Sequence, residues 1–242
     1  MLLVATERIA IGSAVDVSAP SAAVAPLSHL LDAARRRDLG YAAAKRLLDI
    51  VAAAALLLVL LPLFVVIAIA IRLDTPGPVL YRAERIGRFG RPFRVVKFRS
   101  MQAGCSAGPH VAFVQSLLRD ETSCGFYKVT SDTRVTRVGA FLRRTSMDEL
   151  PQLWNVLKGE MSLVGPRPDV AYAVADYADW MHRRLLVKPG ITGLWQVSGR
   201  SRLGLLDMYR LDVAYATSTS LREDLRILIR TIPVVLSRDG AA

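Results

Sequence analysis

The sequence predicts an α+β fold in which a re-entrant membrane segment, a helix, a break and a second helix, carries a small cytoplasmic helical domain with a short β-hairpin. Three features predict this arrangement. An apolar run without a charged residue extends over residues 50–71. Basic residues flank this run on both sides. After it, two short apolar segments separated by a basic turn have the composition of paired strands.

The apolar run has 22 residues, enough for a helix to cross a hydrocarbon core about 30 Å thick. A spanning helix normally has its Lys and Arg residues on the cytoplasmic side. Here both flanks are basic, with Arg35, Arg36, Arg37, Lys45 and Arg46 before the run and Arg72, Arg82, Arg85, Arg88 and Arg91 after it. We therefore expect the segment to enter the bilayer and return, which leaves both flanks near anionic headgroups on one face. A single span and a buried helix of a soluble core are the alternatives.

Pro62 lies in the middle of the run and is the predicted membrane break. A proline inside a helix removes one backbone hydrogen bond and clashes with the carbonyl four residues earlier, here that of Leu58, so a kink is expected. The chain then divides into three predicted parts: a poorly ordered leader rich in Ala, Ser and Val at 1–36, the re-entrant membrane helix at 37–73, and the cytoplasmic domain at 74–242.

The cytoplasmic domain begins with a Thr-Pro-Gly-Pro turn at residues 75–78, which ends any helix. The hairpin strands are expected at 79–81 and 93–98, joined by the turn at 85–92. Further predicted elements are helices at 111–118 and 172–188, a segment at 135–141 that leads into the acidic pair, and a glycine-rich loop at 189–202. The last helix is expected after a capping box formed by Ser220 and Glu223, with one apolar face made of Leu225, Leu228, Ile229 and Ile232.

Residues 143–168 read RRTSMDELPQLWNVLKGEMSLVGPRP and contain the adjacent acids Asp148 and Glu149. Two neighbouring carboxylates repel each other, so such a pair is tolerated where cations or a metal ion balance it, as in nucleophilic and acid/base sites. Capping of a surface helix is the alternative. The pair therefore identifies a candidate catalytic site, provided that other features support it.

A helix is expected to begin at the acidic pair. Ser146 and Glu149 have capping-box spacing and Pro151 suits a first helical position, so the start is expected at Met147 or near Pro151. Either start places Asp148 near the positive end of the helix dipole, which favours the ionised carboxylate. Lys158 followed by Gly159 is expected to end the helix.

The composition is that of a basic protein at a membrane surface. The net charge is +11, the isoelectric point is near 10.2 and 52% of the residues are hydrophobic. No nucleic acid is expected as a partner, because Lys and Arg are spread along the sequence and form no patch interleaved with aromatic residues. A non-enzymatic membrane scaffold would account for the apolar run, but not for Asp148 and Glu149. Cys105 and Cys124 are expected as free thiols.

Seven segments, in order along the chain, resemble the bacterial sugar transferases, the monotopic polyprenyl-phosphate hexose-1-phosphate transferases. They are Lys45-Arg46-x-x-Asp49, the apolar run, Thr75-Pro-Gly-Pro78, Glu84-Arg-Ile-Gly87, Lys97-Phe-Arg-Ser-Met101, residues 131–139 and residues 143–168. The resemblance covers about residues 40–240, and residues 189–200 and 231–241 resemble the exopolysaccharide-initiating branch. One departure is Leu61-Pro62, where many relatives have Ser-Pro, so the break here depends on Pro62 alone.

The resemblance implies an enzyme of the bacterial inner (cytoplasmic) membrane whose catalytic domain, residues 74–242, faces the cytoplasm. It would transfer hexose-1-phosphate from a UDP-sugar to undecaprenyl (polyprenyl) phosphate and so start exopolysaccharide synthesis. Asp148 matches the nucleophile, which would form a covalent aspartyl-phosphosugar and release UMP. Glu149 would balance charge or accept a proton, and Mg²⁺ is expected with Asp148 or Glu149 as ligand.

Cationic side chains near the pair are the expected phosphate-binding groups, because guanidinium groups bind phosphate oxygens bidentately. The predicted substrate-binding residues are Lys97, Arg99, Arg143, Arg144, Pro166, Arg167 and Pro168. For each arginine, a solvated surface cation is the alternative. UDP-glucose and UDP-galactose are favoured by the branch resemblance, but no residue decides between them. The sequence does not show which polysaccharide pathway the protein serves or whether it forms a homodimer.

Overall fold

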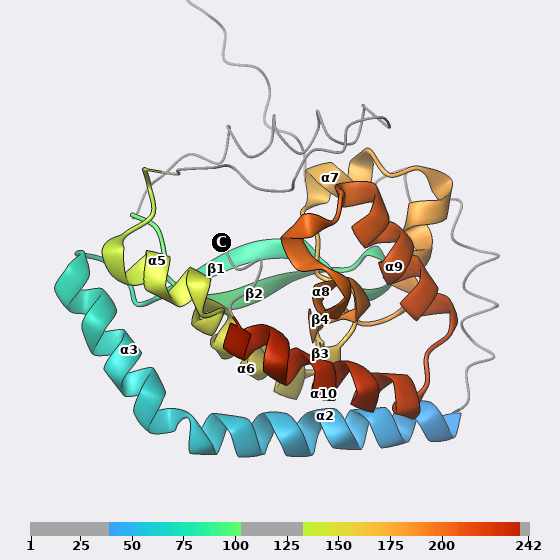
Figure 1. The fold of residues 1–242 in the computed structure, drawn as a ribbon, viewed down its shortest axis with the longest axis horizontal. Helices are drawn as coiled ribbons and strands as arrows, with labels where there is room; N and C mark the ends of the chain where they lie inside the picture. Colours follow the sequence, from blue (N-terminus) through green and yellow to red (C-terminus); the bar gives the residue numbers. More distant parts are fainter. Residues whose placement is uncertain (1–38, 103–132, 238–242) are drawn as a thin grey trace, which may run out of the picture.

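The computed structural model describes residues 39–102 and 133–237. Two helices, α2 (Leu39–Val59) and α3 (Leu61–Asp74), meet at a corner along one side of the molecule (Figure 1). The bend is 60°, and Pro62 lies in the first turn of α3, so the predicted kink is confirmed. Among the described helices, neither α2 nor any other is by itself long and apolar enough to cross a bilayer, and only this bent pair meets that criterion jointly. The re-entrant path stays a prediction.

Polar residues near the start of α2 attach it to the rest of the domain. Lys45 forms an ion pair with Asp224 at 3.0 Å, and Arg46 donates to the main-chain carbonyls of Val156 and Leu157 at 2.7 Å each. The Asp49 carboxylate accepts hydrogen bonds from the Ser162 hydroxyl and the Leu163 amide, both at 3.0 Å. The apolar side chains of Leu47, Val51 and Leu58 are exposed on α2. The start of α2 thus joins the domain through polar contacts, while part of the apolar surface of the helix is left uncovered.

The predicted hairpin is present. Strand β1 (Leu80–Ile86) pairs antiparallel with β2 (Pro92–Phe98), and the short 3-10 helix η2 (Arg88–Gly90) forms the turn. Strand β1 is longer than the predicted 79–81. A bridge between Ile86 and Asp169 adds a further contact at the turn end of the hairpin.

Three short helices follow the first gap: α5 (Arg137–Arg144), the 3-10 helix η3 (Met147–Gln152) and α6 (Leu153–Lys158). The start at Met147 and the end at Gly159, whose φ is 83°, agree with the sequence. The prediction of a capping box formed by Ser146 and Glu149 is wrong. Ser146 has a left-handed backbone, with φ 57°, and its side chain makes no cap hydrogen bond. The Glu149 side chain instead bonds to cations from other elements.

The segment predicted as a glycine-rich loop is largely regular. Strand β4 (Gly190–Thr192) pairs in parallel with β3 (Ser162–Val164), followed by α8 (Leu194–Ser198) and the 3-10 helix η5 (Arg200–Arg202). A Cβ at Gly190 would lie 2.1 Å from the nitrogen of Gly165, so the glycines permit two backbones to approach closely. The predicted helix at 172–188 is two pieces, α7 (Ala171–Ala175) and the 3-10 helix η4 (Asp179–Leu186), because Tyr177 between them packs and bonds with other elements.

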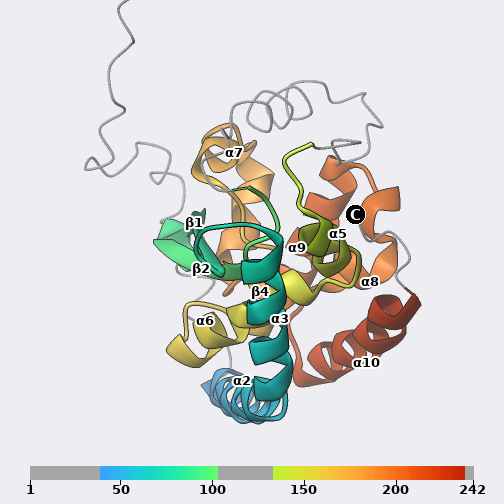
Figure 2. The ribbon, with the colours of Figure 1, turned by 90° about the vertical axis from the view of Figure 1, so that its left-hand side faces the viewer.

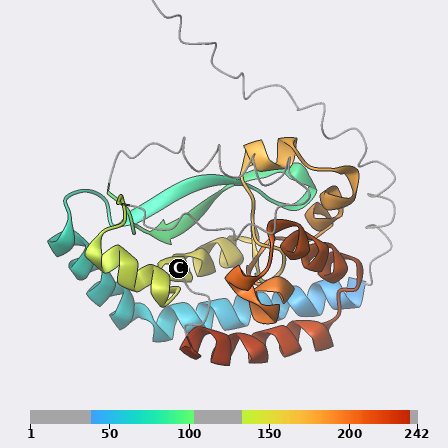
Figure 3. The ribbon, with the colours of Figure 1, turned by 45° about the horizontal axis from the view of Figure 1, so that its top comes forward.

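Helices α9 (Leu205–Thr217) and α10 (Leu221–Ser237) complete the described chain. The Ser220 hydroxyl accepts from the Glu223 amide at 3.2 Å, which is the serine half of the predicted capping box. The predicted apolar face of α10 does not pack as a unit, because Ile227 is the fully buried residue while Leu225, Ile229 and Ile232 are exposed. Helix α10 lies beside α2 (Figure 3), and Figure 2 shows α6 and α10 on opposite sides above α2.

The main core lies between α2, α6 and the strands. Its buried members are Ala53, Val95, Leu153, Val156, Met161, Leu163, Val164, Val187, Tyr215, Ala216 and Ile227. Burial of this apolar surface holds α2 and α10 against the domain that carries the acidic pair. The predicted leader, the predicted helix at 111–118, Cys105 and Cys124 lie outside the described residues.

Candidate active site

A cavity of about 640 Å³ opens between the helix break, η3, α8 and α10. Its charged part contains Asp148, Glu149, Lys97, Arg143, Arg167 and Arg200. Its apolar part is lined by Leu60, Leu63, Ile191, Trp195, Val234 and Val235. The cavity therefore joins an ionic site to an apolar wall that begins at the bend between α2 and α3.

Glu149 is held by two cations at the charged end of the cavity. Arg167 donates to both carboxylate oxygens, at 3.0 Å to Oε2 and 2.6 Å to Oε1, and Lys97 donates to Oε1 at 2.8 Å. Burial acts to raise the pKa of Glu149, but Arg167 and Lys97 outweigh it and hold the pKa far below its ordinary value. Burial also lowers the pKa of Lys97, although Glu149 opposes this shift. Glu149 is therefore a fixed anion that orients its partners.

The environment of Asp148 shifts its pKa in the opposite direction from that of Glu149. The residue is 9% exposed and accepts no hydrogen bond from the described part of the chain. Burial and the neighbouring Glu149 charge raise its pKa, while Lys97, Arg167 and Arg143 act in the other direction. The helix end is expected to favour the ionised carboxylate, but desolvation and the adjacent anion raise the pKa of Asp148 in spite of its place at the start of a six-residue 3-10 helix. A buried carboxylate without hydrogen-bond donors suits attack on an electrophile.

The structure brings three of the predicted cations to the cavity. Lys97 comes from β2, and Arg143 comes from the last turn of α5, where its Nε donates to the Ser100 hydroxyl at 2.9 Å. The Arg167 side chain, 37% exposed, comes from the segment after β3. Three separate elements therefore converge on the acidic pair.

The remaining predicted residues lie elsewhere. Arg99 is 5% exposed and donates to the main-chain carbonyls of Thr75, at 2.7 Å, and Pro76, so its guanidinium joins the hairpin to the end of α3. Arg144 is exposed and does not line the cavity. Pro166 is buried, with its carbonyl accepting from the Gly190 amide at 2.8 Å, and Pro168 lines a neighbouring smaller cavity.

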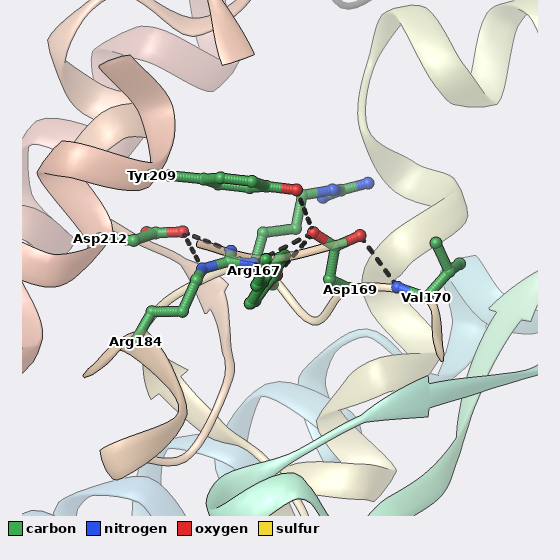
Figure 4. Close-up of polar contacts among 7 residues, drawn as sticks. Arg167, Asp169, Val170, Arg184, Tyr209 and Asp212 are labelled. Atoms are coloured by element: carbon green, nitrogen blue, oxygen red, sulfur yellow. Dashed lines mark hydrogen bonds and ion pairs between the residues drawn. The ribbon is translucent and has the colours of Figure 1, made fainter. Parts of the chain in front are cut away.

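That smaller cavity, of about 160 Å³, shares Lys97, Arg167, Trp195 and Met208 with the larger one. On its wall lie Asp169, Arg184, Tyr209 and Asp212 (Figure 4). With Tyr177 they form a buried cluster that the sequence did not reveal. Burial raises the pKa of Asp212 to about 6, although Arg184 acts to lower it. The five residues come from four segments, so no local spacing announces the cluster.

The donor set permits only a limited metal site. Among the described residues, no group of three or more His, Cys, Asp and Glu side chains is arranged to hold an ion. Both Glu149 oxygens already face cations, whereas the Asp148 carboxylate is free of described donors. These residues fit a Mg²⁺ ion that takes one carboxylate and draws its other ligands from a substrate diphosphate and water, and they do not fit a closed protein cage.

The bacterial sugar transferase family model matches residues 40–238. The chain belongs to this family. Among its relatives, the UDP-galactose-lipid carrier transferase of Erwinia amylovora is 44% identical over 198 residues, which are 81% of this chain and 41% of that protein. The UDP-glucose:undecaprenyl-phosphate glucose-1-phosphate transferase of Caulobacter vibrioides is 43% identical over 209 residues, with 81% of this chain and 71% of the relative covered.

A third relative is covered over most of its length by this chain. The exopolysaccharide production protein ExoY of Rhizobium meliloti is 39% identical over 198 residues, which are 82% of this chain and 88% of that protein. By contrast, this chain spans about two fifths of the Erwinia relative. The family resemblance inferred from the ordered motifs is thereby confirmed.

Proposed function

We propose that this chain is a phosphoglycosyl transferase that moves hexose-1-phosphate from a UDP-sugar to undecaprenyl phosphate and releases UMP, as the first step in building an exopolysaccharide repeat unit. The observation that supports this most is the single cavity in which the acids and four cations adjoin an apolar wall. Such a cavity suits one substrate with a diphosphate and another with a phosphate on a long hydrocarbon chain. The names of the family relatives point to the same chemistry.

In the first half-reaction, a carboxylate oxygen of Asp148 attacks the phosphorus next to the sugar. A bond forms between this oxygen and the phosphorus, and the bond from the phosphorus to the bridging oxygen breaks. UMP leaves with that oxygen and the electron pair. The guanidinium groups of Arg143 and Arg167 stabilise the negative charge on the phosphoryl oxygens, because preorganised cations lower the barrier to phosphoryl transfer.

In the second half-reaction, a phosphate oxygen of the lipid attacks the same phosphorus. The bond between Asp148 and phosphorus breaks, the carboxylate is regenerated, and the sugar is left on a polyprenyl diphosphate. Glu149 contributes by holding Lys97 and Arg167 in place through both half-reactions. When bound, Mg²⁺ would neutralise diphosphate charge and assist departure of UMP, with Asp148 as the one protein ligand that the donor set favours.

The proposed location is the bacterial inner membrane, with α2 and α3 forming a re-entrant segment and the acidic pair on the cytoplasmic side. Three observations support it: the 60° bend at Pro62, the uncovered apolar side chains of α2, and the basic residues on both flanks. In this arrangement the apolar wall of the cavity starts at Leu60 and Leu63, so a lipid phosphate reaches Asp148 from the bilayer.

Covalency gives the test of the proposed function. UDP-sugar alone should release UMP up to one equivalent and leave radiolabelled sugar phosphate on the protein, because the nucleophile is part of the chain. Asp148→Asn keeps the shape but removes the attacking anion, so label and turnover should both be lost. Glu149→Gln retains the nucleophile and serves as the control, with slowed labelling expected. Label on the Asp148→Asn variant would show that another residue is the nucleophile, and no UMP release without lipid would show that transfer is direct.

A further inference from the structure

Arg184 uses every N–H of its guanidinium inside the protein. It is 3% exposed at its side chain. Its Nε donates to Asp212 at 3.2 Å, one terminal nitrogen donates to Asp212 and to the main-chain carbonyl of Arg167 at 2.8 Å, and the other donates to Asp169 at 3.1 Å and to the Tyr177 hydroxyl. A guanidinium has five N–H groups, and these contacts account for all five. Its position is therefore strongly determined.

The contacts of Arg184 hold the segment 167–169 at both ends (Figure 4). One contact is with the main-chain oxygen of Arg167, and another is with the side chain of Asp169. The Asp169 carboxylate also accepts from the hydroxyls of Tyr177, at 2.9 Å, and Tyr209, and its main-chain oxygen accepts from the Ile86 amide at 2.8 Å. Pro166 and Pro168 restrict φ on either side of Arg167. The backbone from which the Arg167 side chain extends is thus fixed.

The Arg167 side chain itself is less constrained. It is 37% exposed and reaches Glu149 at 2.6 Å and 3.0 Å from the rim of the catalytic cavity. A long side chain at a partly open site loses its bidentate geometry when its backbone shifts by a fraction of an ångström. The contacts therefore run in a chain from Asp212 to Arg184, from Arg184 to Arg167, and from Arg167 to Glu149.

Stability alone does not explain this cluster. Desolvation of a buried guanidinium and two carboxylates costs much of what their attraction returns, and apolar residues of similar volume stabilise a protein as well or better. We propose that Arg184, held by Asp212, is a positioning residue that sets Arg167 on Glu149 for the first half-reaction. This inference rests on the proposed function for its kinetic test, but not for its spectroscopic one.

The spectroscopic test follows the Glu149 carboxyl by ¹³C NMR in protein labelled at the glutamate carboxyl carbon and held in detergent micelles. Arg167→Ala should raise the pKa of Glu149, because it removes the principal charge that lowers it. Arg184→Lys keeps a positive charge but loses the fork, so it should raise the same pKa in the same direction. In the double variant, Arg184→Lys should not raise the Glu149 pKa beyond its value in Arg167→Ala alone. An unchanged Glu149 pKa in folded Arg184→Lys would overturn the proposal.

The kinetic test measures UMP release from UDP-sugar alone. Arg184→Lys should slow release by more than about tenfold in the otherwise unmodified chain and by less than about twofold in an Arg167→Ala background, because residues in one chain of contacts are not additive. Equal losses in both backgrounds would show a merely structural role. Where circular dichroism shows that Arg184→Lys does not fold, Asp212→Asn takes its place and should shift both readouts in the same direction.

Arg46→Lys is the matched control, since Arg46 also donates to two main-chain carbonyls but lies away from the cavity. It should leave the Glu149 pKa and the rate of UMP release unchanged, and an effect as large as that of Arg184→Lys would contradict the inference. Wild-type protein that releases no UMP, while Arg184→Lys still raises the Glu149 pKa, would refute the proposed function and leave the positioning role intact.

Discussion

Asp148 and Glu149 are adjacent, yet their pKa values move in opposite directions. Burial and the Glu149 charge raise that of Asp148, whereas Arg167 and Lys97 overcome burial and lower that of Glu149. Two acids whose pKa values are shifted apart in this way take different roles, one reactive and one permanently ionised. The rate of the first half-reaction should therefore fall on acidification as Asp148 is protonated, at a pH above the ordinary aspartate range.

Glu149→Gln tests this coupling between the two acids. Loss of the Glu149 charge removes one cause of the raised Asp148 pKa and frees Lys97 and Arg167 to act on Asp148. Both changes lower the Asp148 pKa, so the acidic limb of the pH–rate profile should move to lower pH even though the maximal rate falls. Rapid-quench measurement of UMP release at a series of pH values gives the limb. A limb that stays in place or moves upward would show that another group controls it.

At the scale of elements, local signals predicted what local physics determines. Pro62 specifies the break, Gly159 ends α6 in a left-handed conformation, and the hairpin follows from two apolar segments around a turn. Tertiary contacts decide the rest. The pairing of β3 with β4 joins three-residue strands separated by a helix and a 3-10 helix, which no periodicity reveals.

The candidate site divides in the same way. The acidic pair and its cationic surroundings could be predicted from residue type, because adjacent carboxylates need counter-charges. The direction of each cation could not. Strand β2 ends at Phe98, so Arg99 leaves the alternation that would have placed it on the same side as Lys97, and it bonds to Thr75 and Pro76 instead. Arg184 and its partners were missed because they meet only in the folded chain.

The bend between α2 and α3 carries a testable consequence for topology. Pro62→Leu restores a backbone donor and removes the ring clash, so the helix should straighten and part of the population should span the membrane. The assay uses chains without Cys105 and Cys124, carrying Leu39→Cys or Arg91→Cys, and a membrane-impermeant thiol reagent outside intact cells. Neither cysteine should react in the chain that retains Pro62. After Pro62→Leu, one of the two should react.

Leu61→Ala changes the neighbouring residue but keeps the proline, so it serves as the control for the topology assay and should leave both sites protected. Reaction at one flank in the chain that retains Pro62 would exclude the re-entrant path. Protection of both flanks after Pro62→Leu would show that the contacts of α2 and α3 with the domain, and not the proline, maintain the bend.

At the scale of the molecule, the bent helix pair, the acidic pair and α10 surround one cavity, with charge at one end and apolar side chains at the other. This division predicts that the two substrates can be separated by mutation. Val235, 37% exposed, lines the apolar wall, and Val235→Asp places a carboxylate where a hydrocarbon chain would lie. Desolvation of that charge should raise KM for undecaprenyl phosphate by about tenfold or more. UMP release from UDP-sugar alone should be unaffected, since the charged end is unchanged.

Leu225→Asp introduces the same charge at an exposed position of α10 outside the cavity and should leave the KM for undecaprenyl phosphate near its original value. If both variants raise it equally, the effect belongs to the surface of α10 and not to the cavity, and the lipid must reach Asp148 by another route.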